Sequence, residues 1–140
     1  MKQAELISTL DHELVAYRQA RRDHQHDVAW THLERAHVVS QPLLRLHLGV
    51  HWLMLGFAAS VGDTREVMGQ ALRLLLAPLG AFIGQIPLGN TGRARVNAFE
   101  AMPIPADLKH LFESASPAVC ISVSSTHPTI VATPVWCGAH

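Results

Sequence analysis

The chain has 140 residues, of which 11 are basic and 11 are acidic, so its formal net charge at pH 7 is zero. A neutral chain offers no field for a nucleic acid or an anionic membrane surface, and this length fits a single domain with a real core. Two cysteines imply no disulfide framework, whereas ten histidines make the net charge sensitive to pH below about 7.

The first predicted element is an amphipathic helix over residues 3–22. Apolar side chains recur there at spacings of three and four, which is the period of a helix that buries one face. These side chains are Leu6, Leu10, Leu14 and Tyr17. Glu13 lies at the edge of their stripe and is either a solvated side chain, an additional metal ligand or a hydrogen-bond partner for a metal-bound histidine. The acidic residues of this segment are atypical of a signal peptide, which predicts a cytoplasmic protein.

A second helix is predicted to run to about Ser40, with Asp27 as its N-cap. Pro42 then opens a third helix, which is apolar on nearly all sides, as expected for the central helix of a small bundle. The apolar stretch at residues 43–61 is long enough to span a membrane, but Arg45 and two histidines interrupt it. We therefore expect a buried helix of a soluble protein.

A glutamate and three histidines recur at helical spacing on either side of Pro42. Glu34 and His37 are three residues apart. His47 and His51 are four residues apart, so each pair shares one helix face. If the helices fold back about Pro42, their equal rise per residue brings all four side chains together across roughly 8–10 Å. Imidazole and carboxylate groups bind divalent transition metals such as Zn, Fe, Ni or Co, which predicts a metal site. The alternative is that His47 and His51 are core histidines, hydrogen-bonded by Glu34 and a backbone carbonyl.

A fourth helix is predicted to begin at Asp63 or Thr64, after Gly62 has ended the third. Glu66 occupies the third helical position, which is typical of a capping box. The inward positions are Val67, Ala71, Leu74 and Leu75. Pro78 is expected to kink or end this helix and to start a second short one.

From residue 87 the chain is rich in Pro and Gly. This composition predicts an extended segment that wraps the helices until Pro105 starts a terminal helical turn. The Gly-Asn-Thr-Gly sequence at residues 89–92 is either an ordinary Asn/Gly turn or, with Arg93 and Arg95, a cradle for an anion.

The last part of the chain differs in composition from the rest. Residues 114–140 contain no Asp, Glu, Lys or Arg. We interpret residues 1–113 as a helical domain and residues 114–140 as a disordered or loosely docked tail, in which Cys120 and Cys137 define no metal site.

Five features of the body of the chain occur together. They are His37, His47, HWLML at residues 51–55, GNTGRARV at residues 89–96 and MPIPADL at residues 102–108. In this combination the chain resembles a small bacterial family, domain of unknown function 3703, over about residues 6–112. The resemblance implies no activity and no ligand set, and it ends before the uncharged tail. It places the histidines and the GNTG turn in the body that the family shares.

The sequence thus predicts an all-α fold: a small antiparallel array of about four main helices, a Gly/Pro-rich wrapping segment and a short terminal helix. The leading hypothesis is a metal-binding protein for metal handling or sensing. Its predicted ligands to a divalent transition metal are Glu34, His37, His47 and His51, with Glu13 as a supplement. No acid–base pair can be named, so no reaction or catalytic residue is predicted.

The alternative hypothesis is a helical protein-interaction module in which the histidines are structural. Ala29, Leu33 and Ala36 resemble positions of tetratricopeptide repeats, which bind proteins. The expected partner is therefore a metal ion under the first hypothesis, and another protein or a second copy of the chain under the alternative.

Overall fold

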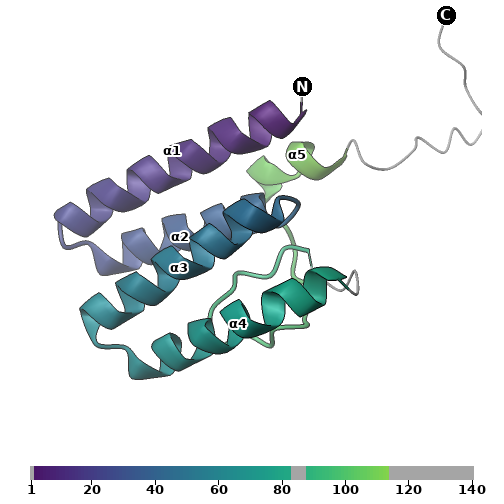
Figure 1. Cartoon of the computed structure of the whole chain (residues 1–140). Helices are drawn as coiled ribbons and strands as arrows, with labels where there is room; N and C mark the ends of the chain where they lie inside the picture. Colours follow the sequence, from purple (N-terminus) through teal and green to yellow (C-terminus); the bar gives the residue numbers. More distant parts are fainter. Residues whose placement is uncertain (1, 83–87, 114–140) are drawn as a thin grey trace, which may run out of the picture.

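A computed structural model describes residues 2–82 and 88–113 (Figure 1). The elements in these ranges are α1 (Lys2–Arg22), α2 (His26–Ser40), α3 (Leu44–Val61), α4 (Thr64–Phe82), the 3₁₀ turn η1 (Ala106–Leu108) and α5 (His110–Glu113). No strand occurs among them, so the predicted all-α fold of four main helices is confirmed. The predicted tail, with Cys120 and Cys137, lies outside the described residues.

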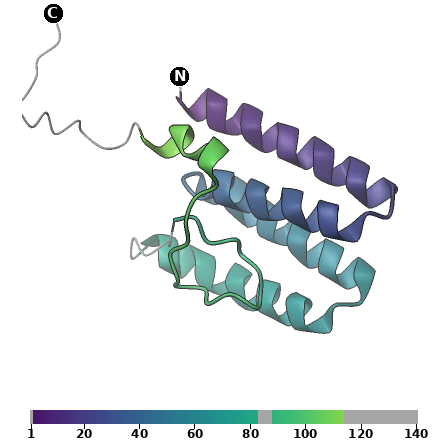
Figure 2. The same cartoon turned by 180° about the vertical axis from the view of Figure 1, so that it is seen from behind.

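The four long helices form an antiparallel array in which neighbours in sequence are neighbours in space (Figure 1). Residues 88–105 cross one face of this array, over α2 and α4, and lead to α5 beside the start of α1 (Figure 2). The predicted wrapping segment and terminal helix are therefore present. We call residues 88–96 the strap, because this part lies against the buried polar residues of α2, α3 and α4.

The apolar core is formed mainly by α1, α2 and the second half of α3. Its centre is Phe57, whose ring lies 5.6 Å from that of Tyr17 and 5.0 Å from that of Trp30, measured between centroids. The other core residues are Leu6, Leu10, Ala20, Ala29, Leu33, Ala36, Val39, Val50, Met54, Ala58, Leu108 and Leu111. The first half of α3 instead buries His47 and His51, so the polar site begins where the apolar core ends.

The helix ends agree with the sequence in part. As predicted, Gly62 ends α3 in the left-handed conformation at φ 75°, and the Glu66 N–H donates to Asp63 Oδ1 at 3.0 Å at the start of α4. The predicted capping box is only half formed, because the Asp63 N–H donates to the Ala58 carbonyl and the Glu66 carboxylate accepts from other groups. The prediction for Asp27 was wrong: the N-cap of α2 is Gln25, and Asp27 lies in the first turn. Pro42 was predicted to open α3, but the helix begins two residues later, at Leu44.

Helix α4 departs furthest from the prediction. It continues past Pro78 to Phe82, because a proline removes only one main-chain N–H and here only the last turn remains beyond it. Leu75, predicted to face inward, is 78% exposed, whereas Glu66 and Gln70 are buried. The inward face of α4 meets the strap, whose backbone groups need hydrogen-bond partners. Polar side chains therefore lie on the face that was expected to be apolar.

Helix α3 is the one helix of the described residues that is long and apolar enough to cross a membrane. Its mean hydropathy is 1.2, which a core helix of a small domain also reaches. It packs between α2 and α4 and buries two histidines, as expected for a core helix.

A pair of glycines tests how tightly the strap packs on α4. A Cβ at Gly69 would lie 2.3 Å from the Cβ of Ala94, whereas a Cβ at Gly49 on α3 would meet nothing within 4 Å. We expect Gly69→Ala to destabilise the fold by about 1–3 kcal/mol, because overpacking outweighs the gain in helix propensity. The matched change Gly49→Ala should stabilise it by up to about 1 kcal/mol in urea unfolding. Equal effects of the two changes would contradict this packing.

Candidate metal centre

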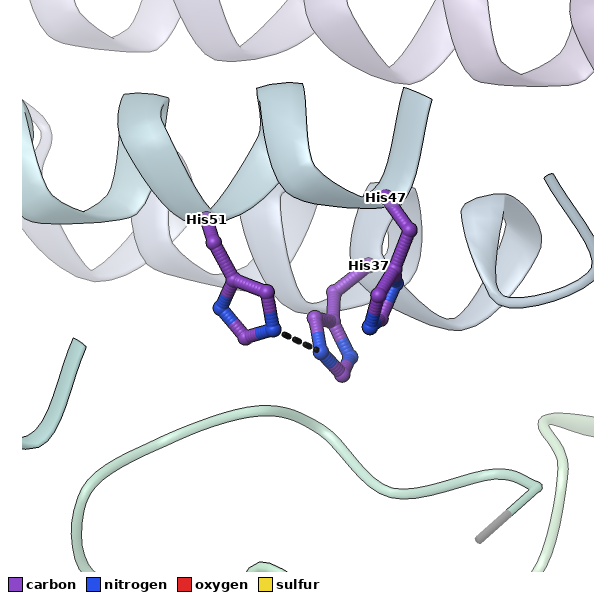
Figure 3. Close-up of side chains that lie close together, drawn as sticks. All are labelled: His37, His47 and His51. Carbon is purple, nitrogen blue, oxygen red and sulfur yellow. Dashed lines mark hydrogen bonds between the residues drawn. The ribbon is translucent and has the colours of Figure 1, made fainter. Parts of the chain in front are cut away.

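Three histidines from two helices lie together in the interior. His37 comes from α2, and His47 and His51 come from α3 one turn apart (Figure 3). Their exposed fractions are 4%, 4% and 2%, and their ring centroids are 4.5–4.8 Å apart. One ring nitrogen from each lies within 4.8 Å of the other two, which is the kind of group that can hold a metal ion. We call these residues the histidine cluster.

The Nδ1 atom of every ring in the cluster is held by an oxygen atom. His37 Nδ1 lies 2.8 Å from the carbonyl oxygen of Asn90. His51 Nδ1 lies 2.8 Å from Gln70 Oε1, and His47 Nδ1 lies 3.2 Å from Ser40 Oγ. In each ring the oxygen holds the nitrogen that faces away from the other two rings, and this contact fixes the orientation of the ring.

The partners of these oxygens determine which nitrogen carries the hydrogen. A carbonyl oxygen only accepts, so His37 must donate through Nδ1 to Asn90. Gln70 directs its NH₂ group to Glu66 and to the carbonyl of Gly92, so its Oε1 accepts from His51. The same reasoning applies to His47.

The hydroxyl of Ser40 has a single hydrogen, which it donates to the carbonyl oxygen of His37 at 2.9 Å. Its oxygen is thus free to accept from His47 Nδ1. Each neutral ring then carries hydrogen on Nδ1 and a lone pair on Nε2, the tautomer of a histidine that binds metal through Nε2.

The Nε2 atoms of His37 and His51 are 3.3 Å apart. Two lone pairs at this distance repel each other unless a proton or another cation lies between them. A tetrahedral ion with metal–nitrogen bonds of about 2.0–2.1 Å would separate its ligand nitrogens by about 3.3 Å. The spacing of this pair is therefore that of two ligands on one metal ion.

Burial opposes a proton as the shared cation. It lowers the pKa of His37 well below 6.5, and positive charge on His47 or His51 lowers it further. Burial is also the main cause that brings the pKa of His47 down to about 4. The pKa of His51 is lowered by burial and by the nearby Arg73, although the bond to Gln70 opposes the shift. The cluster is consequently neutral at pH 7 and keeps its lone pairs available.

The strap closes the cluster from the side opposite α3. Gly92 has φ 77°, and a Cβ at this position would lie 2.6 Å from His37 Nε2, so only glycine fits against this ring. The Gly92 N–H donates to Asn90 Oδ1, and the Gly89 N–H donates to Gln41 Oε1, both at 2.9 Å. These two bonds are typical of an ordinary Asn/Gly turn, and neither N–H group is available to an anion.

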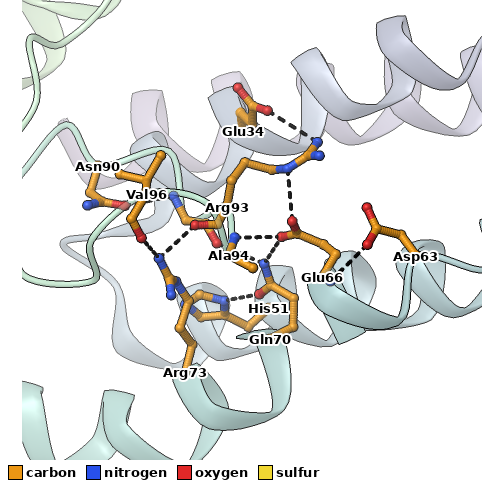
Figure 4. A network of polar contacts seen from close by, with 11 residues as sticks. Glu34, His51, Asp63, Glu66, Gln70, Arg73, Asn90, Arg93, Ala94 and Val96 are labelled. Carbon is orange, nitrogen blue, oxygen red and sulfur yellow. Dashed lines mark hydrogen bonds and ion pairs between the residues drawn. The ribbon is translucent and has the colours of Figure 1, made fainter. Parts of the chain in front are cut away.

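Behind Gln70 lies a buried polar network (Figure 4). Glu66, 1% exposed, accepts from Gln70 at 2.8 Å, from the Ala94 N–H at 3.0 Å and from Arg93 Nε at 3.2 Å. The guanidinium of Arg93 also lies 3.8 Å from the centroid of the Trp30 ring. Arg73 donates to the carbonyls of Arg93 and Val96, both at 2.7 Å. The network thereby fixes both the strap and the amide that orients His51.

The two predicted carboxylate ligands lie elsewhere. Glu34 lies 3.5 Å from Arg93, and Glu13 pairs with His32 and Arg35, both at 2.8 Å. Neither belongs to the group of potential ligands around His37. Glu13 is a buried partner of a histidine, as one interpretation proposed, but that histidine is outside the cluster.

Sequence reasoning missed the three acceptor residues. Ser40 is seven residues before His47, the histidine that it holds, and the turn between α2 and α3 separates them. Gln70 and Asn90 are 19 and 53 residues from the histidines that they hold, so no local pattern reveals them.

A family described as "Protein of unknown function (DUF3703)" matches residues 4–112, which confirms the resemblance expected over residues 6–112. No curated protein and no solved structure matches the chain.

The histidine cluster should make stability fall with acidification. Below about pH 6.5 the histidines of the unfolded chain bind protons, whereas the buried rings stay neutral, so acidification favours unfolding. This effect continues until the pH reaches the pKa of the folded rings, about 4 for His47. Each such ring contributes up to about 1.4 kcal/mol per pH unit. We expect lower stability at pH 5.5 than at 7.5 in urea unfolding with chelator present. Stability that is flat or rises toward acid would contradict neutral burial.

Proposed function

Since the chain belongs to the DUF3703 family of proteins of unknown function, we propose from its histidine cluster that it binds a divalent transition metal. The proposed ligands are the Nε2 atoms of His37, His47 and His51. Glu13 and Glu34 are left out of this set because neither carboxylate belongs to the group of potential ligand atoms around the three rings. The proposed role is metal handling or sensing, in the cytoplasm that the acidic first helix predicts.

One observation carries this proposal: all three Nδ1–H groups are bonded to oxygen atoms, so all three Nε2 lone pairs are left for one cation. Core histidines that served packing alone would have no reason to turn their lone pairs toward one another. Metal-bound histidines in proteins have this outer hydrogen bond almost without exception.

The shape of the cluster favours some metals over others. The three centroid distances are nearly equal, so the rings form a three-sided set rather than a row. Three imidazoles in such a set suit tetrahedral Zn or Co with one coordination position left for another ligand, whereas Cu(II) prefers ligands in a square plane. Because all three rings are buried, a role in holding the ion is better supported than a reaction on a substrate.

The alternative, a helical protein-interaction module, is favoured by a separate observation. Helices α3 and α4 expose large apolar side chains, including Trp52 at 63%, Met68 at 70% and Leu75 at 78%. Side chains of this kind mark a partner site where they form one continuous apolar patch. Their exposure does not account for the orientation of the three rings, so we place the metal function first.

Metal content tests the function directly. Purified without an affinity tag and loaded with Zn, the chain should hold about one ion. His47→Ala plus His51→Ala should hold none, because only one imidazole of the histidine cluster is left. The control, His12→Ala plus His110→Ala, removes two exposed histidines and should retain the ion.

A titration of the unaltered protein with Co(II) avoids any question of whether the variant folds. The intense visible absorption of tetrahedral Co(II) should saturate at one equivalent. Weak octahedral absorption throughout, or equal metal in the unaltered chain and the double variant, would rule the proposal out.

The outer hydrogen bonds should tune the affinity. Ser40→Ala removes the hydroxyl oxygen that accepts from His47 Nδ1 and leaves the bond of this ring to the His37 backbone, so we expect metal affinity to fall about 10-fold. Ser60→Ala is the matched control, because the Ser60 hydroxyl donates to the Phe57 carbonyl three residues earlier, as Ser40 does to His37, but holds no histidine. Competition with a chromogenic chelator measures both. Equal affinities of the two variants would contradict the role of Ser40.

A further inference from the structure

A hollow of about 260 Å³ lies between α2 and the residues that follow α4. Its lining is formed by Thr31, Glu34, Arg35, Val38, Gly89, Thr91, Met102, Pro103 and Pro105. None of the three clustered histidines lines it, so it is separate from the candidate metal centre. It is smaller than the roughly 300–1,000 Å³ pockets of drug-sized ligands, so it suits a smaller molecule.

The charge of Arg35 is already neutralised within the fold. Its Nε donates to Glu13 Oε1 at 2.8 Å and its Nη2 donates to Asp107 Oδ2 at 2.6 Å. Two carboxylates thus face one guanidinium at this end of the hollow. Arg35 therefore offers little attraction to an anion in the hollow.

Glu34 is in the opposite situation. Its ionic contact among the described residues is Arg93 Nη1 at 3.5 Å, and Arg93 also pairs with Glu66 at the shorter distance of 3.2 Å. Arg93 therefore serves two carboxylates and lies nearer to Glu66, which Arg73 also neighbours, so Glu34 has the weaker counter-charge of the two. Burial raises the pKa of this carboxyl, which indicates that it has lost water without a full counter-charge in return.

The remaining walls are mostly apolar. Val38, Pro103 and Pro105 offer no polar side-chain atoms, and Met102 offers only a thioether. Such walls cannot replace the hydration shell of a metal ion, but they can cover the carbon atoms of an organic cation. A carboxylate beside an apolar surface is complementary to an ammonium or guanidinium group on a short hydrocarbon body.

We propose that this hollow is a binding site for a small organic cation, a primary amine or guanidine whose charged group pairs with Glu34. Its apolar part lies against Val38, Met102 and the two prolines. The proposal does not depend on the metal function, because the hollow and the histidine cluster share no side chain.

The test uses n-butylammonium chloride as the probe, followed by backbone amide NMR shifts of the ¹⁵N-labelled chain at constant ionic strength. Saturable shifts at Gly89 and Thr91 are expected at millimolar probe, with 1-butanol and sodium butyrate giving none. Glu34→Gln keeps the shape and removes the charge, and should weaken binding at least tenfold. Glu5→Gln removes an exposed carboxylate on α1 and should leave the affinity unchanged.

Several results would overturn the proposal. One is equal binding of 1-butanol, which would make the hollow a purely apolar site, and another is unchanged affinity in Glu34→Gln. Displacement of the probe by magnesium chloride at equal concentration would point instead to a hydrated divalent cation. Titrations with and without bound Zn should agree, so failure here and failure of the metal proposal are distinguishable.

Discussion

The buried imidazoles of the histidine cluster are the constraint on which the rest of the centre depends. A buried N–H without an acceptor costs about 1–3 kcal/mol, so three adjacent rings require three oxygens. The chain supplies a hydroxyl from the end of α2, an amide from α4 and a backbone carbonyl from the strap. Because each oxygen comes from a different segment, the arrangement exists only once α2, α3, α4 and the strap are assembled.

The same bonds explain how the strap keeps a fixed path without being a helix or a strand. Its backbone groups are bonded to side chains: Gln41 to Gly89 and Asn90, Gln70 to Gly92, and Arg73 to Arg93 and Val96. Asn90 in turn donates to the carbonyls of Asn97 and Glu100. Gln70 and Asn90 each bond both to the strap and to a histidine, so the same residues hold the strap and the histidine cluster in place.

This shared requirement also accounts for the unusual polarity of α4. The helix turns Glu66 and Gln70 inward and leaves Met68, Leu72 and Leu75 exposed. An apolar inward face would bury more hydrocarbon but would leave the carbonyl of Gly92 and the N–H of Ala94 without partners. The exposed apolar side chains can then contact another protein, as the alternative hypothesis of an interaction module requires.

The hollow beside α2 follows from the same arrangement. The strap lies close to α2 at Asn90, where His37 and Gln41 both donate to its carbonyl. The residues on either side, Gly89 and Thr91, line the hollow. One turn of the strap therefore separates the histidine cluster from the candidate site for an organic cation.

The sequence alone determined the helices and the pairing of two of them. Spacings of three and four, the glycine after α3 and the break at Pro42 are local features, and they predicted four helices and the meeting of His37 with His47 and His51. Only the tertiary structure decided which other groups complete the site. Glu34 shares a helix with His37, yet it turns to Arg93, 59 residues away, because a half-buried carboxylate gains most from the nearest guanidinium. Gln70 and Asn90 reach the histidines through long-range packing, and hydrogen bonds between distant segments leave no periodic pattern in a sequence.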